Sequence, residues 1–337
     1  MRKLLQQLLK RPITWVGDHF GASAKKESVD RSLTDLYENS KKIKSKRIKV
    51  LNSDLSNAKF IIFSDQHKGN RSPADDFRAS EKNYIAALNY YNSNRFTFIN
   101  LGDSEELWKF TAQQILPANK ESFAAEAAFQ PRRYYKTFGN HDLIWKNKLD
   151  VILLLKNYFK MPLPVYEGLV LRNQSTNFKL DIFLTHGHQG DLMSDNNAFS
   201  TWIVAHIWLP LQRYLRININ SPSKDFSLRN KHNKMMYDWS SRQEDLLLIT
   251  GHTHSPVFAS GKYLDHPSNK IDTGKDMNDV KPSYFNSGCC CYSDGDITGI
   301  EIADGHIRLI KWYDEEVQPK RKVLEEIGFE KLTADLK

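Results

Sequence analysis

The sequence predicts an α/β fold built around layered sheets. Two observations lead to this prediction. Short β-type runs recur from residue 58 onward, and each is followed by a loop or a helix-like stretch such as SEKNYIAALNYYN. Strands that alternate with helices are typical of layered α/β proteins. The chain has 337 residues and 40 % hydrophobic composition, which is ample for a substantial core.

A further observation concerns the ends of these runs: five of the β-type runs end in Asp, Asn or His. They read AKFIIFSDQH, RFTFINLGD, RRYYKTFGNHD, FKLDIFLTHGHQGD and LLLITGHTH. α/β proteins build their sites at the edge of the sheet where such strands end. The pattern therefore predicts that metal-binding side chains gather at one edge.

The first 55 residues are predicted to form a separate, partly helical, basic segment. Residues 1–50 carry 13 Lys or Arg against 5 Asp or Glu, whereas the remaining residues carry 35 of each sign. Leu4, Leu5, Leu8 and Leu9 fall on one helical face. This stretch is too short for a signal peptide or a membrane span. Two interpretations remain: peripheral contact with an anionic membrane, or a helix that docks on the main domain.

Residues 56–337 are predicted to form one domain, with a helical insertion at about residues 192–245. Residues 199–215 of the insertion are apolar around more than one helical face. They fit either a helix pair packed on both sides or an exposed surface for a lipid or partner. Residues 257–313 resemble short strands of a second, closing sheet, and residues 315–337 resemble a polar tail that is helical in part.

The cysteine content argues against a disulfide scaffold and against a disulfide-linked partner. Cys289, Cys290 and Cys291 are adjacent, and the chain has no other cysteine. A reducing compartment is expected, so we predict a cytoplasmic protein, peripheral to the membrane if the N-terminal segment binds lipid. The three thiols fit either small apolar residues of a buried strand or ligands of a soft metal.

The ends of the five runs supply seven candidate metal ligands. A mixture of Asp, Asn and His suits manganese best, with iron, zinc or cobalt as alternatives. Seven side chains are too many for one ion that keeps an open position, whereas two ions that share a carboxylate fit the count. The candidates are Asp65, His67, Asp103, Asn140, His186, His252 and His254.

Five motifs occur in a fixed order: SDQH, LGDSEE, FGNHDL, THGHQ and TGHTH. In this order they resemble the calcineurin-like metallophosphoesterase superfamily. The resemblance implies an αββα sandwich with the insertion between the fourth and fifth motifs. It also implies that Asp65, His67 and His254 bind a first metal, that Asn140, His186 and His252 bind a second, and that Asp103 bridges them.

The same resemblance implies a hydrolase in which a metal-bridging hydroxide attacks phosphorus. His141 would act on the leaving-group oxygen as general acid or electrostatic stabiliser, and Asp142 would fix its tautomer. His188 is interpreted as a hydrogen-bond partner or a substrate contact, and Arg71 as a phosphate contact or a surface arginine.

The substrate is predicted to be a phosphodiester or pyrophosphate, and an amphiphilic one is favoured by a second resemblance. The layout from THGHQGD through the insertion to GHTHSPV is similar to the UDP-2,3-diacylglucosamine pyrophosphatases of lipid A synthesis. Those enzymes typically carry GNRD where this chain has GNHD. Two alternatives stay open: a nuclease, supported by the basic N-terminal segment, and a non-catalytic scaffold of the same fold.

Overall fold

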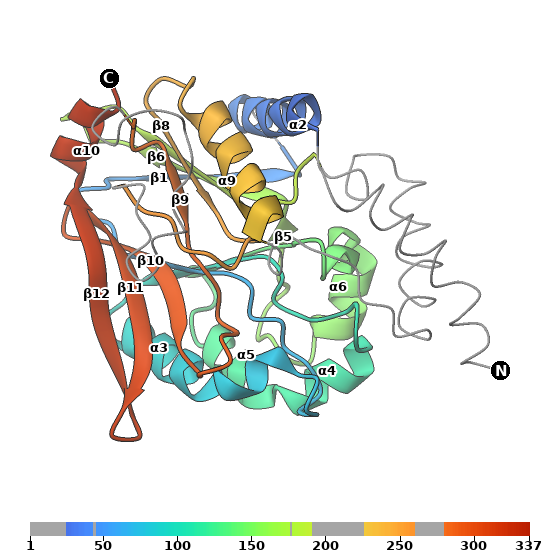
Figure 1. Ribbon diagram of the computed structural model, residues 1–337. Helices are drawn as coiled ribbons and strands as arrows, with labels where there is room; N and C mark the ends of the chain where they lie inside the picture. The colour runs from blue at the N-terminus through green and yellow to red at the C-terminus, as the bar shows by residue number, and fades with distance from the viewer. Residues whose placement is uncertain (1–24, 43–44, 176, 191–225, 260–279) are drawn as a thin grey trace.

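The computed structural model describes residues 25–42, 45–175, 177–190, 226–259 and 280–337, and its strands form two sheets (Figure 1). The larger sheet has the order β12-β11-β10-β2-β3-β4-β5, and the smaller has the order β1-β6-β7-β8-β9. The strand bounds are β1 Ile48–Ser53, β2 Phe60–Phe63, β3 Thr97–Leu101, β4 Tyr134–Thr137, β5 Val165–Tyr166, β6 Gly168–Asn173, β7 Asp181–Thr185, β8 Leu246–Thr250, β9 Tyr284–Asn286, β10 Ile297–Ala303, β11 His306–Glu315 and β12 Gln318–Gly328.

Helices cover the outer face of each sheet, so the molecule is an αββα sandwich. Helices α2 and α9 pack on the five-stranded sheet, and α3 and α5 pack on the seven-stranded sheet. One apolar cluster lies between each sheet and its helices, and a third fills the space between the two sheets. The predicted α/β class and layered architecture are confirmed. The helix bounds are α2 Lys26–Glu38, α3 Glu81–Ser93, α4 Ala112–Ala118, α5 Lys120–Ala127, α6 Lys148–Leu155, α9 Phe226–Ser240 and α10 Phe329–Asp335.

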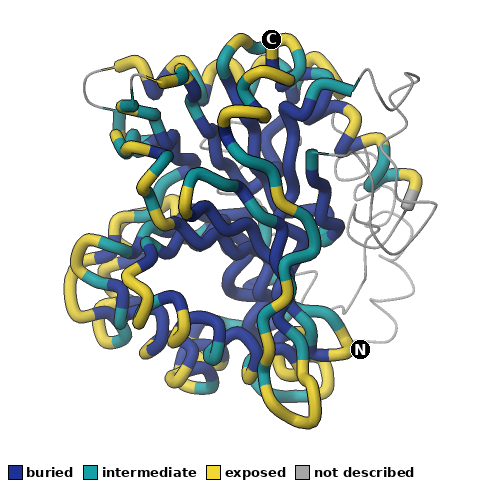
Figure 2. Tube along the Cα trace, turned by 90° about the vertical axis from the view of Figure 1, so that its left-hand side faces the viewer, coloured by how far each residue is buried: buried dark blue, intermediate teal, exposed yellow. Residues whose placement is uncertain are grey.

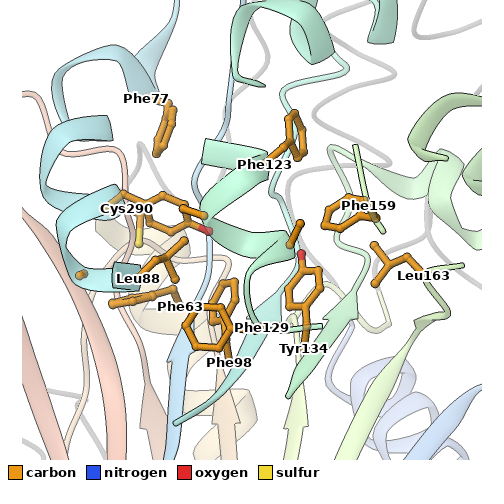
Figure 3. Packing of buried hydrophobic residues seen from close by; sticks show 14 of the residues in the cluster. Phe63, Phe77, Leu88, Phe98, Phe123, Phe129, Tyr134, Phe159, Leu163 and Cys290 are labelled. Carbon is orange, nitrogen blue, oxygen red and sulfur yellow. The ribbon is translucent and has the colours of Figure 1, made fainter. Parts of the chain in front are cut away.

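The central strands are buried on both faces because each sheet lies between two apolar layers. All four residues of β2 and all five of β8 are buried, and Figure 2 shows the buried strands at the centre with exposed segments mostly around them. On the outer face of the larger sheet, aromatic side chains supply much of the packing. Phe98 stacks on Tyr134 with ring centroids 5.3 Å apart, and Tyr134 stacks on Phe159 at 5.5 Å (Figure 3).

The five predicted strands correspond to β2, β3, β4, β7 and β8, and each ends directly before its motif. The parallel strands β2, β3 and β4 are adjacent, as are the parallel strands β7 and β8. Because parallel strands end at the same edge of a sheet, the motif loops gather there.

The C-terminal region differs from its prediction in two respects. The described strands of residues 257–313, expected to form a second, closing sheet, are divided between the two sheets: β9 lies beside β8, whereas β10 and β11 extend the sheet that contains β2. Residues 315–337, expected to be a polar tail that is helical in part, contain the long edge strand β12 before α10. β12 pairs with β11 in antiparallel register from Gln318 to Gly328. Its residues are exposed or half-buried throughout, so the strand lacks the apolar alternation that would have indicated it.

Part of the predicted N-terminal segment is built into the sandwich. Val29, Leu33 and Leu36 of α2 are buried against the five-stranded sheet, and β1 pairs with β6 in parallel. The predicted amphipathic stretch at residues 4–9 and the apolar stretch at residues 199–215 lie outside the described residues. Among the described residues, no helix has the length and apolarity that crossing a bilayer requires.

Candidate metal centre

The loops that follow β2 and β3 lie side by side and position the first candidate ligands. Asp65 N donates to Gly102 O at 3.0 Å, and His67 N donates to Asp103 O at 3.0 Å. A second set of contacts joins the loops of different sheets, because His252 N donates to Asp65 Oδ2 at 3.0 Å. Backbone bonds therefore set the positions of these motif residues relative to one another.

The backbone at the centre is strained. Five of the seven candidate ligands adopt a positive φ although none is glycine, and this conformation is uncommon for residues with a Cβ. Such outliers persist only where the surrounding structure enforces them, and they cluster at functional sites. The five are Asp65 at 53°, His67 at 50°, Asp103 at 50°, His252 at 69° and His254 at 55°.

Two glycines leave space that the ligands occupy. A Cβ on Gly139 would lie 2.7 Å from Asp103 N and 2.7 Å from Cδ2 of His186. A Cβ on Gly251 would lie 2.7 Å from Cβ of Ser64 and would also collide with the carboxylate of Asp65. The GNHD and GHTH motifs therefore need glycine at these positions for close approach.

The donors predicted for a first metal lie together. His67 Nε2 is 3.0 Å from His254 Nε2 and 3.8 Å from Asp65 Oδ1. His254 Nε2 is 3.2 Å from Asp65 Oδ1. Two of these side chains come from the seven-stranded sheet and the third from the five-stranded sheet, so the group lies where the two sheets meet.

The donors predicted for a second metal lie beside the first group. A ring nitrogen of His186, one of His252 and a carboxylate oxygen of Asp103 lie within 4.8 Å of one another. Asp103 Oδ2 is 3.1 Å from His186 Nε2 and 3.8 Å from His67 Nε2. The Asp103 carboxylate therefore lies between the two groups. Asn140 follows β4 at the same edge.

Burial and mutual charge shift the pKa values of these groups in opposite directions. Burial opposes charge on Asp65, but the imidazoles of His186 and His254 outweigh it and hold the pKa of Asp65 well below its usual range. Burial lowers the pKa of His186, but the carboxylates of Asp103 and Asp65 outweigh it and raise that pKa to about 9. Burial, together with electrostatic repulsion from His232 and His186, holds the pKa of His252 well below its usual range. The protein thus compensates the buried carboxylates with imidazole charge.

Glu106, and not Asp142, contacts the ring of His141. Oε1 of Glu106 lies 2.8 Å from Nδ1 of His141, and Oε2 lies 3.2 Å from Nδ1 of His67. Asp142 instead accepts hydrogen bonds from the backbone of Gly139 at 2.6 Å and Ser104 at 2.9 Å. This corrects the predicted role of Asp142: its short side chain is used to hold the loops together.

The indole of Trp108 stacks on one face of the His141 ring. The two rings stack with centroids 3.9 Å apart, and Trp108 Nε1 donates to Asn140 O at 3.0 Å. His141 N donates to Asp103 Oδ1 at 2.8 Å. The His141 ring bonds Glu106 through Nδ1, stacks on Trp108 and meets the His67 ring edge-on with centroids 4.5 Å apart, yet the His141 side chain stays 16 % exposed, against 0 % for His186. His141 is therefore accessible to a substrate.

Arg71 and His188 have different surroundings from the other predicted site residues. The guanidinium of Arg71 forms a two-pronged ion pair with Glu81, and its Nε donates to Ala118 O at 2.8 Å. Three of the five N–H donors of Arg71 are engaged in this way, which favours the interpretation of Arg71 as a surface arginine over that of a phosphate contact. His188 is buried beside His186, with ring centroids 5.4 Å apart. Burial and the charge of His186 lower the pKa of His188 to about 3, so it is a neutral neighbour of a candidate ligand.

Sequence reasoning missed two other residues beside the centre, Glu106 and His232. Glu106 lies three positions after Asp103, a spacing that could have indicated it. His232 of α9 is buried, contacts Gly187 O through Nε2 at 2.8 Å, and has its ring centroid 5.0 Å from that of His252. Cys291, one of the three thiols considered as ligands of a soft metal, has its Sγ 3.6 Å from Nδ1 of His254. Nothing in the local sequence of His232 distinguishes it from an ordinary helix residue.

A layer of buried charges supports the loops from below. Lys68, Glu105 and Lys136 are all buried. Lys136 Nζ lies 3.0 Å from Glu105 Oε2, which also accepts from Trp145 Nε1 at 2.7 Å, and Lys68 Nζ donates to Ser104 Oγ at 2.7 Å. Burial opposes the charge on Glu105, but Lys136 and Lys68 outweigh it and lower its pKa to about 2. Removing either the buried lysines or the buried glutamate would leave the opposite charge buried without a partner.

The residues at this edge fit a pair of divalent cations. Imidazole and carboxylate donors converge from both sheets, which is the donor chemistry of borderline transition metals. Oδ1 of Asn140 is buried and has no hydrogen-bond partner among the described residues. A buried oxygen of this kind is costly unless a donor or a cation satisfies it. The described residues at this edge therefore offer candidate ligand groups for divalent metal ions.

A family model described as calcineurin-like phosphoesterase matches residues 58–256. No curated protein matches the chain. Among solved structures, a dimetal phosphatase from Danio rerio is 10 % identical, with 80 % of this chain and 98 % of that chain covered and a TM-score of 0.42.

Vacuolar protein sorting 29 from Cryptosporidium parvum is 10 % identical, with 80 % and 98 % of the two chains covered and a TM-score of 0.35. A single mutant of Vps29 from Entamoeba histolytica is 16 % identical, with 80 % and 99 % covered and a TM-score of 0.32. The family model spans more than half of the chain and includes all five motifs. This chain belongs to the calcineurin-like phosphoesterase family.

Proposed function

We propose that the protein is a metal-dependent phosphoesterase that hydrolyses a phosphodiester or pyrophosphate bond. One observation carries the proposal: the carboxylate of Asp103 lies between two groups of donors, with Oδ2 3.1 Å from His186 Nε2 and 3.8 Å from His67 Nε2. When bound, two divalent cations would supply Lewis acidity towards a phosphoryl oxygen and would activate water at neutral pH. A scaffold would not need this complete donor set.

The chain's own residues would have distinct roles in the reaction. Asp65, His67 and His254 would hold one cation, Asn140, His186 and His252 the other, and Asp103 both. His141 is fixed at Nδ1 by Glu106, which leaves Nε2 to face a substrate and to transfer a proton to a leaving-group oxygen. Trp108 would keep water from one face of that ring.

A nucleotide-lipid is the substrate class that we favour. The support is the layout from THGHQGD to GHTHSPV, which is similar to that of the UDP-2,3-diacylglucosamine pyrophosphatases. His141 stands where those enzymes typically have arginine, so the present chain offers an imidazole in place of a guanidinium. That difference predicts a related but distinct substrate.

The experiment measures hydrolysis of bis(p-nitrophenyl) phosphate by the purified protein with Mn²⁺. Asp103→Asn should abolish hydrolysis and reduce the bound metal, determined by mass spectrometry. Glu326→Gln, on the exposed strand β12, is the matched control. Unchanged activity in Asp103→Asn would refute a two-metal mechanism. The substrate class is then tested by competition: UDP-diacylglucosamine should inhibit, whereas inhibition by single-stranded DNA alone would identify a nuclease.

A further inference from the structure

An exposed apolar surface lies on and just beyond α6. Six large hydrophobic residues are exposed in the part of the chain that the structure describes, and four of them fall between residues 149 and 161. We call these four the α6 patch: Leu149 is 66 % exposed, Ile152 53 %, Leu153 63 % and Met161 52 %. A cluster of this kind on one short segment marks an interaction surface, whereas single exposed apolar residues do not.

The helix places its apolar residues on two faces. Val151 and Leu155 are buried and fasten α6 to the core. Leu149, Ile152 and Leu153 have the i, i+3, i+4 spacing that puts side chains on one side of a helix, and this side is exposed. Packing within the described residues therefore accounts for the apolar residues on the buried face of α6 but not for those on its exposed face.

The α6 patch has a rigid support. Phe159 and Leu163, on either side of Met161, are buried in the aromatic cluster of the larger sheet (Figure 3). At the other end, Trp145 precedes the helix and donates to Glu105 at 2.7 Å, and the side chain of Asn147 accepts from Leu149 N at 3.0 Å. Three of the four residues of the α6 patch therefore lie on an ordered helix, and Met161 lies between two buried residues of the core.

Four exposed lysines flank the residues of the α6 patch along the chain. Lys146, Lys148, Lys156 and Lys160 are all exposed, and none forms an ion pair with a residue in the described ranges. Asp150 is the single acidic residue between residues 143 and 161. An apolar helix face with a basic border matches an anionic lipid surface, in which the apolar side chains enter the headgroup region and the lysines contact phosphates.

We propose that the α6 patch docks the protein on an anionic membrane surface. The location is consistent with a use in substrate access, because only the short helical turn Leu143–Lys146 separates α6 from the GNHD motif. In Figure 1, α6 lies on the opposite side of the molecule from β12, so the surface is distinct from the exposed edge of the larger sheet. The inference concerns membrane binding alone and holds whether or not the proposed hydrolysis is correct.

The test uses the full chain and sedimentation with two kinds of vesicle: phosphatidylcholine alone, and phosphatidylcholine mixed with phosphatidylglycerol. Binding should require the anionic lipid and should weaken as salt is raised. Leu149→Gln with Leu153→Gln should weaken binding by roughly tenfold or more. Each of Lys148→Gln and Lys156→Gln should weaken it by about fivefold. Val317→Gln and Lys331→Gln are matched exposed controls and should bind as the unmodified protein does.

Three outcomes would overturn the proposal. The first is the absence of binding to either vesicle. The second is binding that survives the α6 substitutions but is lost in Leu4→Gln with Leu8→Gln, which would assign binding to the N-terminal segment. The third is a change of oligomeric state in the α6 variant, measured by analytical ultracentrifugation, without a change in vesicle binding, which would make the patch a contact between chains. Circular dichroism and hydrolysis of the chromogenic ester check that the variants are folded.

Discussion

The carboxylate of Glu106 accepts a hydrogen bond from Nδ1 of His141 at 2.8 Å. Burial opposes the charge of Glu106, but the imidazoles of His141 and His67 outweigh it and hold the pKa of Glu106 well below its usual range. An ionised Glu106 can only accept, so the Nδ1 nitrogen of His141 carries the proton. The other ring nitrogen is then the one that meets a substrate.

Glu106→Gln should slow turnover by about 10- to 100-fold without loss of metal. The amide keeps the shape of the side chain but removes the charge that favours one tautomer of His141 and supports His67. The measurements are kcat on the chromogenic diester and the metal content of the same sample. If metal is lost together with activity, Glu106 acts mainly through His67.

His141→Asn should keep both metals and reduce turnover by about 10²- to 10⁴-fold, the range for a lost general acid. The reduction should shrink on a diester with a more acidic leaving group, because such a group needs less protonation. A variant that loses metal would reassign His141 as a ligand, an outcome that its position within 4.8 Å of His67 and Asp103 permits.

Gly251→Ala should lose metal affinity and stability together. The new methyl group would lie 2.7 Å from Cβ of Ser64 and would displace the carboxylate of Asp65, which should cost about 1–3 kcal/mol. Gly328→Ala is the control, since its methyl group would lie 3.5 Å from the nearest atom. Thermal unfolding with and without Mn²⁺ separates the two effects. Retention of normal metal affinity in Gly251→Ala would contradict the close-approach argument.

Lys136→Met should destabilise the fold by about 3–5 kcal/mol, because it leaves the buried Glu105 without its nearest cation. Adding Glu105→Gln to this variant should recover part of the loss, since the remaining charge is then removed as well. The free energy of unfolding in urea is the measurement, with Lys331→Met as the exposed control. A double variant less stable than the single one would show that Glu105 is supported mainly by Lys68 and Trp145.

Arg71→Gln should leave kcat/KM unchanged and lower stability by about 1 kcal/mol or less. Its guanidinium is paired with Glu81 and is one-third exposed, with a side-chain accessibility of 32 %. A selective rise in KM for a phosphate substrate would instead return Arg71 to the site.

The sequence predicted the motif residues at the strand ends better than it predicted the side chains that contact them from other parts of the chain. Each of the five motifs directly follows an apolar run, and this order can be recognised in the sequence alone. Because parallel strands end at the same edge of a sheet, the order was enough to predict that the motifs gather there. The partner of His141 was misassigned because Asp142 is its neighbour in sequence, whereas Glu106 reaches it from another loop. His232 and β12 carried no pattern at all: the first is a single residue on a helix, and the second is a strand without apolar alternation.

Each sheet of the sandwich supplies only part of the donor set. Asp65, His67, Asp103 and Asn140 follow strands of the larger sheet, whereas His186, His252 and His254 follow strands of the smaller one. A slip of one sheet over the other by a single residue, about 3.3 Å along a strand, would separate donors that now lie together. The apolar side chains packed between the two sheets therefore keep the two parts of the donor set aligned. A change in the size of these apolar side chains should therefore change the metal affinity.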